Sequence, residues 1–236
     1  MQLALAHELG VPVTIRVTAN YRDLEMRTRA GEAHIVWAPA GVCAKLGNVS
    51  RAVYKAVRQG VSTYRSAIVA LRAPSVSLDH LDGLRAAWVD PYSMGGYLLA
   101  ADFLRRRGAD PDQVFVRQTF HRSHSDALHA VTGGTADLSA VTAWSDDPRS
   151  LRDALTLHIG PIERKIVVLA VTDEAPTDAV VLTTQLSEEY AERLTQKLFP
   201  SEKTGKAPSF LLAALDAEGF VRTEAAEYLP LLRLMR

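Results

Sequence analysis

The segment 90–97 (DPYSMGGY) has the residue types and spacing of a ligand-binding turn. It lies between a predicted strand, 85–89, and a predicted helix. A helix that begins there presents unpaired backbone N–H groups and the positive end of its dipole, and both suit an anion. Ser93 could donate its hydroxyl, while Gly95 and Gly96 would let a ligand approach the backbone. The alternative is structural: Ser93 caps the helix and the glycines form a turn.

A second group of polar residues occupies the next predicted strand-to-helix junction. Ser123 and Asp126 match the Ser-x-x-Asp capping box. His121, Arg122 and His124 place three nitrogen donors at the same helix start, which favours a bound oxyanion. The alternative is an ordinary capped helix with solvated basic side chains. A metal held by His121 and His124 is disfavoured, because no third ligand accompanies them.

Signatures of catalysis are largely absent from the sequence. It has no Gly-x-Ser-x-Gly elbow, no phosphate-binding loop and no dinucleotide fingerprint. Cys43 lies in an apolar run and is expected to be inert packing. The aromatics Tyr21, Trp37 and Tyr64 stand at predicted element edges, where packing is the commoner role. Tyr64 is the strongest ligand candidate of the three, and no catalytic residue, cofactor or metal is predicted.

The elements that position these residues follow a strand–helix–strand rhythm. Glycines close the first two predicted helices, and this pattern predicts an α/β fold with mixed, mostly parallel sheets flanked by helices. The predicted strands are 11–17, 33–37, 61–71, 85–89, 113–118, 136–141, 155–159 and 165–172. The predicted helices are 1–9, 22–30, 96–107, 123–133, 186–198, 210–215 and 225–234.

Two long β-rich segments, 61–71 and 165–172, bracket the middle of the chain. They predict two lobes joined by two crossing strands. Lobe one would contain 1–72 plus 173–236, and lobe two would contain 73–172. The alternative is a single doubly wound sheet.

Composition excludes several classes of protein. The 236 residues are 47% hydrophobic, with 27 basic and 27 acidic side chains, so neither a disordered chain nor a general nucleic-acid binder is expected. No apolar stretch approaches the ~20 residues that span a bilayer, so direct membrane insertion is not expected. The single cysteine excludes an intrachain disulfide. The start of the chain lacks the basic region of a signal peptide.

Four stretches together carry a family resemblance. They are YRDL at 21–24 with GEAHIVW at 31–37, YRSAIV at 64–69, DPYSMGGY at 90–97, and Ser123 and His124 followed by Ala127, Val131, Gly133, Ala136 and Asp137. In order and spacing the chain resembles the phosphate/phosphite/phosphonate-type solute-binding proteins of ABC transporters. The resemblance implies a two-lobed type 2 periplasmic binding fold that captures a small oxyanion by hinge closure.

The resemblance and the two junctions together nominate a set of ligand-binding residues. They are Tyr64, Ser93, Met94, Gly95, Gly96, Arg122, Ser123 and His124. The family usually carries further hydroxyl residues just after the first serine of the turn, where this chain has Met94 and Gly95. That departure favours a larger or less charged solute than phosphonate itself. A transporter permease is the implied partner, and the implied location is periplasmic or at the cell surface.

The front of the chain departs from the family. Members begin with a signal peptide and a strand, whereas this sequence is expected to start inside the helix that follows them. A cytoplasmic location is expected if the chain as given is complete. Two other functions stay open. One is a lyase or dehydratase on the same fold, with Ser93 and His124 catalytic; the other is a cytosolic anion-sensing domain.

Overall fold

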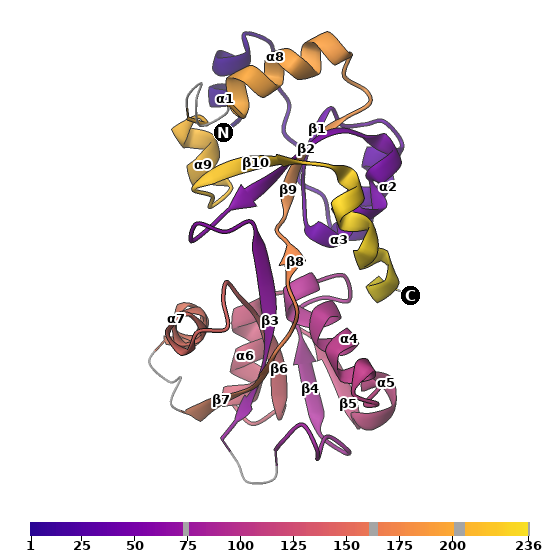
Figure 1. The fold of residues 1–236 in the computed structure, drawn as a ribbon, viewed down its shortest axis with the longest axis vertical. Coiled ribbons are helices and arrows are strands. Elements are labelled where there is room, and N and C mark those ends of the chain that lie inside the picture. The colour runs from indigo at the N-terminus through magenta and orange to yellow at the C-terminus, as the bar shows by residue number, and fades with distance from the viewer. Residues whose placement is uncertain (73–75, 161–164, 201–205, 236) are drawn as a thin grey trace. The chain divides into compact units, whose positions relative to one another are not determined.

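The chain folds into two compact units (Figure 1). The computed structural model describes residues 1–72, 76–160, 165–200 and 206–235. The first unit contains Met1–Ser62 and Pro176–Arg233; the second contains Thr63–Ala175 and the C-terminal end from Leu234. The sequence predicts the changes of unit after residues 72 and 172, whereas the structure divides the chain after Ser62 and after Ala175. Residues 73–75, which follow the first predicted boundary, lie outside the described residues.

The first unit is built on a four-stranded sheet. Its order is β1 (Ile35–Ala38), β9 (Ala179–Thr183), β2 (Ser50–Val57) and β10 (Gly219–Thr223). Every neighbouring pair is antiparallel. The prediction of parallel strands is therefore wrong for this unit, because β1 pairs with β9 from the C-terminal half instead of with residues 11–17. Those residues alternate apolar and polar side chains but form no strand.

Helices cover the sheet of the first unit. They are α1 (Gln2–Leu9), α2 (Tyr21–Arg29), α3 (Ala40–Lys45), η1 (Gly47–Val49), α8 (Glu188–Leu198), α9 (Ser209–Ala214) and the C-terminal η4 (Ala225–Met235). Leu9 of α1, Leu194 of α8 and Leu211 of α9 share one core cluster with Tyr54 and Leu182 of the sheet. Gly10 ends α1 in the left-handed conformation, with φ of 70°, as its position predicts.

Cys43 is part of the packed interior of the first unit. Its side chain is 2% exposed, and its thiol donates to the carbonyl of Ala38 over 3.3 Å. Burial raises the pKa of the Cys43 thiol, with a further contribution from the charge of Asp178. The thiol therefore stays protonated at neutral pH.

The second unit contains a mixed sheet. Its strands run in the order β5 (Arg117–Phe120), β4 (Arg85–Trp88), β6 (Leu138–Ala143), β3 (Thr63–Leu71) and β7 (Ile166–Val171), and the short β8 (Ala175–Pro176) also pairs with β3. Strand β4 is parallel to both β5 and β6, whereas β3 is antiparallel to β6 and β7. The mixed sheets are as predicted, but the parallel pairings are confined to this part of the molecule.

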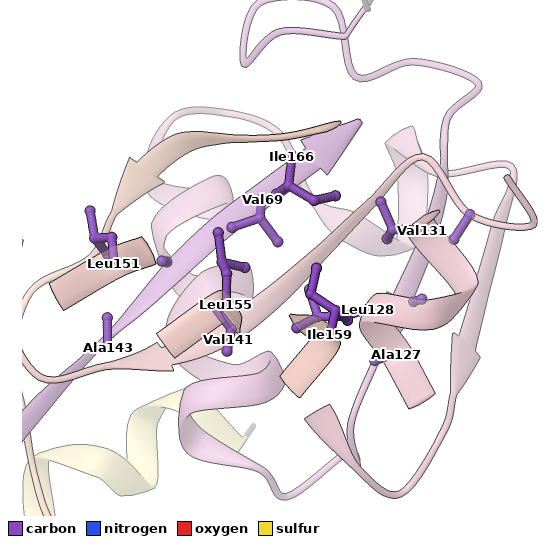
Figure 2. Packing of buried hydrophobic residues seen from close by; sticks show 13 residues of the cluster. Val69, Ala127, Leu128, Val131, Val141, Ala143, Leu151, Leu155, Ile159 and Ile166 are labelled. Carbon is purple, nitrogen blue, oxygen red and sulfur yellow. The ribbon is translucent and has the colours of Figure 1, made fainter. Parts of the chain in front are cut away.

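Alternating side chains of β3 belong to two hydrophobic cores on opposite faces of this sheet. Val69 packs with α6 (His124–Thr132) and α7 (Pro148–Ile159), as Figure 2 shows, whereas Ile68 packs with α4 (Leu99–Arg106). This two-residue period is what a strand buried on both faces requires. The remaining helices of the unit are η2 (Met94–Leu98), a π-helical turn that leads into α4, and α5 (Pro111–Val114).

The predicted strand at 155–159 is wrong, because these residues end helix α7. Asp147 caps the helix by accepting the N–H groups of Arg149 and Ser150, and Pro148 occupies the first helical position. Leu151, Leu155 and Ile159 then recur every four residues and are buried in the core that Figure 2 shows. Among the described residues, no helix combines the length and apolar character needed to cross a membrane.

Candidate functional site

The two junctions that stand out in the sequence lie side by side in the second unit. Strands β4 and β5 are parallel neighbours, so the turns that follow them emerge at the same edge of the sheet. The backbones of the two turns are hydrogen-bonded to each other. The N–H of His121 donates to the Trp88 carbonyl over 2.9 Å, and the N–H of Arg122 donates to the Val89 carbonyl over 2.7 Å.

Ser93 opens the first turn and caps η2. Its hydroxyl oxygen accepts the N–H of Gly96 over 3.2 Å, and its carbonyl accepts the N–H of Leu98 in the wide π-helical ring. Among the described residues the Ser93 hydroxyl has no acceptor of its own, so its proton can be donated to a ligand. The N–H groups of Met94 and Gly95, in the first helical turn, have no carbonyl within the helix to bond. This turn therefore offers donors suited to an anion.

The two glycines of this turn are required by close packing. A Cβ atom on Gly95 would lie 2.3 Å from Oγ1 of Thr142, and one on Gly96 would lie 2.3 Å from Cγ2 of Val89. The carbonyl of Gly95 also accepts the hydroxyl of Ser66 over 2.7 Å. Gly95 thus rests against Ser66 and Thr142, which are cross-strand partners on β3 and β6.

Ser123 opens the second turn and caps α6, as the capping box predicts. Its hydroxyl oxygen accepts the N–H of Asp126 over 3.0 Å, and the hydroxyl donates to the Asp126 carboxylate over 2.7 Å. The proton of Ser123 is therefore engaged within the helix, unlike that of Ser93. Arg122, just before it, is exposed and has φ of 70°, a left-handed conformation that costs free energy for a residue with a side chain.

His124 is the first residue of α6, and its ring faces the protein. Nε2 lies 3.2 Å from Oγ1 of Thr142, while Nδ1 is buried and, among the described residues, has no hydrogen-bond partner. Burial lowers the pKa of His124 to about 4, with His158 as the second cause and the Ala140 backbone opposing both. The ring of His158 is centred 5.2 Å away. The imidazole of His124 is therefore neutral at physiological pH.

The other candidates have different surroundings. Tyr64, on β3, is 9% exposed, and its ring meets the edge of Trp144 with centroids 6.1 Å apart. Met94 is 4% exposed. Nε2 of His121 bonds the hydroxyl of Thr119 over 2.8 Å, so this ring serves its own strand. Trp37 belongs to the first unit.

Sequence reasoning missed three residues that contact the two turns. Ser66 lies within β3, Thr142 lies near the end of β6, and His158 lies on α7. Their positions carry no local motif; only the pairing of Ser66 with Thr142 across β3 and β6 brings them to Gly95. In the described part of the chain, no three His, Cys, Asp or Glu side chains gather as a metal-ligand set.

A family model described as "ABC transporter, phosphonate, periplasmic substrate-binding protein" matches residues 1–228. The chain belongs to this family. Its members are binding proteins of transporters, not enzymes, which sets aside a lyase or dehydratase with Ser93 and His124 as catalytic residues. Among curated proteins, none matches the chain.

Solved structures share the fold of this phosphonate-type binding protein. A binding protein component of an ABC phosphonate transporter from Pseudomonas aeruginosa is 20% identical, with a TM-score of 0.77 over 99% of this chain and 78% of that one. A Xanthomonas citri protein bound to ATP is 19% identical, with a TM-score of 0.80 over 99% and 89%. PhnD1 of Prochlorococcus marinus, in complex with methylphosphonate, is 18% identical, with a TM-score of 0.76 over 99% and 88%. The resemblance and the type 2 periplasmic binding fold expected from the sequence are confirmed.

Proposed function

We propose that this chain captures a phosphorus oxyanion, a phosphonate or a related phosphoryl compound, for an ABC transporter. The observation that carries the proposal is the pair of helix-opening turns held together by the bond from the Arg122 N–H to the Val89 carbonyl. Two helix starts at one sheet edge direct their positive ends to a common place. The ligands of two structural relatives, methylphosphonate and ATP, both carry phosphorus–oxygen groups.

The donors we assign come from both turns. Ser93 gives its hydroxyl, and the backbone of Met94, Gly95 and Gly96 gives the amides of the first turn. The exposed guanidinium of Arg122 and the group around His124 come from the second turn. Tyr64 contributes a hydroxyl from β3, and Ser123 serves as the helix cap because its proton is held by Asp126. Such donors bind an oxyanion without any chemistry on it.

Hinge closure is the motion we propose. The chain passes between its units twice, at Ser62–Thr63 and at Ala175–Pro176. Hydrogen bonds join the two passing segments: Thr177 donates its N–H to the Ser62 carbonyl over 3.1 Å, and Thr63 donates its hydroxyl to Glu174 over 3.1 Å. Two short paired connections allow rotation with few changes of dihedral angle. The permease of the transporter is the proposed partner, and the periplasm is the proposed compartment.

A thermal-shift screen tests the proposed ligand class. The probes are methylphosphonate, phosphite, phosphate and ATP, with sulfate and acetate as comparison anions. A ligand at one hundred times its dissociation constant adds about 2.7 kcal/mol to the free energy of unfolding, so a bound phosphorus oxyanion should raise the melting temperature clearly. Absence of any shift with all four phosphorus compounds, on folded protein, would overturn the proposal. Small-angle scattering with and without the best ligand then tests closure.

A further inference from the structure

The hydroxyl of Thr142 lies between the two turns of the second unit. It occupies the space that a side chain on Gly95 would fill, 2.3 Å from the Cβ position of that residue. It also lies 3.2 Å from Nε2 of His124, which belongs to the other turn. Thr142 itself is partly exposed. One hydroxyl on β6 therefore contacts both groups of residues to which we assign the anion.

The direction of the bond between Thr142 and His124 follows from the rest of the imidazole ring. A neutral imidazole carries one proton, on Nδ1 or on Nε2. Nδ1 is buried and has no partner with hydrogen-bond geometry among the described residues, and the Ala140 backbone is the smallest influence on the pKa of the ring, so a proton on Nδ1 would be poorly satisfied. A proton on Nε2 has the Thr142 oxygen as its acceptor. The tautomer with its proton on Nε2 is therefore favoured, and this N–H donates to the oxygen of Thr142.

That direction frees the hydroxyl proton of Thr142. An oxygen that accepts from His124 keeps its own O–H for another acceptor. Its neighbour Ser66 already donates to the Gly95 carbonyl. Among the described residues the Thr142 hydroxyl has no hydrogen bond besides the one to His124, and the residue is partly exposed, so its proton is available to a ligand.

We propose that Thr142 is a direct ligand-binding residue that donates its hydroxyl to the oxyanion, and that His124 acts as a positioning residue that holds this hydroxyl. The proposal rests on the proposed function, because it assigns donors within the same site. It replaces a direct contact from His124 with a relay from Nε2–H to Thr142 and from Thr142 to the ligand. The site then presents a neutral hydroxyl where an imidazolium would add charge, so a change in the protonation of His124 does not set the affinity for the anion.

The test compares matched variants by titration calorimetry with methylphosphonate, phosphite and phosphate. Thr142→Val keeps the shape and removes the hydroxyl, and we expect affinity to fall about tenfold to a hundredfold. Thr142→Ser keeps the hydroxyl and should restore most of the affinity. Thr119→Val removes the hydroxyl of the neighbouring Thr–His pair and should leave affinity unchanged, because within the described chain this hydroxyl bonds only His121 and the carbonyl of Ala86 on the adjacent strand β4.

A double mutant separates positioning from direct contact. If His124 acts through Thr142, then His124→Leu combined with Thr142→Val binds no more weakly than Thr142→Val alone. Losses that add would mean that His124 contacts the ligand directly, and the relay would be wrong. Nitrogen-15 NMR of the imidazole in unliganded protein gives a reading that does not depend on any variant: a proton on Nε2 supports the proposal, and one on Nδ1 overturns it.

The outcomes for wild-type protein distinguish this inference from the proposed function. If wild-type protein binds one of the three probes and Thr142→Val binds it equally well, only the role of Thr142 is lost. If folded wild-type protein binds none of them, the proposed function and the inference fall together.

Discussion

The carbonyl of Val89 accepts the backbone N–H of Arg122 over 2.7 Å. This bond joins the residue after β4 to the residue before the cap of α6, and so fixes the two helix starts against each other. Their relative position is set by backbone and sheet register, and ligand-binding side chains can be changed without moving it. Substitutions in the two turns should therefore separate affinity from stability.

The two capping serines make a matched pair. Ser93→Ala removes the hydroxyl that we expect to donate to the ligand, so binding of the best phosphorus oxyanion should weaken by about 1.5–3 kcal/mol of binding free energy. Ser123→Ala removes a proton already held by Asp126, so affinity should be unchanged. Both variants should lose about 1 kcal/mol of stability as helix caps. Calorimetric titration and thermal unfolding measure the two effects, and equal losses of affinity in both variants would show that the donors are misassigned.

Arg122 combines a strained backbone with an exposed charge. Arg122→Gly relieves the left-handed conformation and should raise stability by up to about 1 kcal/mol. The same change removes a guanidinium from the proposed site, so affinity should fall, more at low ionic strength than at high. Arg122→Lys keeps the positive charge but cannot form the two parallel hydrogen bonds of a guanidinium, so its affinity should lie between those of wild type and Arg122→Gly. Affinity of Arg122→Gly equal to wild type would remove this residue from the site.

Gly95 has no room for a side chain. Gly95→Ala places a Cβ atom against Thr142, and we expect stability to fall by about 1–3 kcal/mol, together with loss of binding. Gly219→Ala in β10 is the control, because nothing lies within 4 Å of its Cβ position. Denaturant unfolding measures both. If Gly95→Ala is as stable as Gly219→Ala, the packing against Thr142 is looser than described.

His124 should make stability depend on pH. Its folded-state pKa is lowered from 6.5 to about 4, so the neutral ring contributes stability above pH 6.5 that is lost as the pH falls toward 4. One proton gives a slope of up to about 1.4 kcal/mol per pH unit. His158, whose pKa burial also lowers, contributes in the same direction.

Two histidine-to-glutamine variants test whether His124 causes this pH dependence of stability. His124→Gln should flatten the fall in stability between pH 6.5 and 4, whereas His129→Gln, on the exposed side of the same helix, should leave it intact. Urea unfolding across this range is the measurement. A slope that His124→Gln does not change would place the responsible group elsewhere.

Local signals in the sequence predicted the two turns and most elements of the second unit. Ser123 and Asp126 form the expected capping box, and Ser93 caps its turn, because both depend on residues three apart. The predictions that failed depend on pairing between residues far apart in the sequence. Strands β2 and β9 escaped notice, since β9 is buried throughout and lacks alternation, and residues 11–17 alternate without a partner strand. Thr142 has no motif at all, because only sheet register brings it to Gly95.

The sole cysteine of the sequence also has a practical consequence. Cys43 is protonated and buried, so maleimide or similar reagents should leave it unmodified in folded protein. A cysteine introduced at an exposed position, such as Leu3 in one unit or Leu157 in the other, would then carry a dye or spin label selectively. The chain can therefore be labelled as an optical reporter of ligand binding without first replacing its own cysteine.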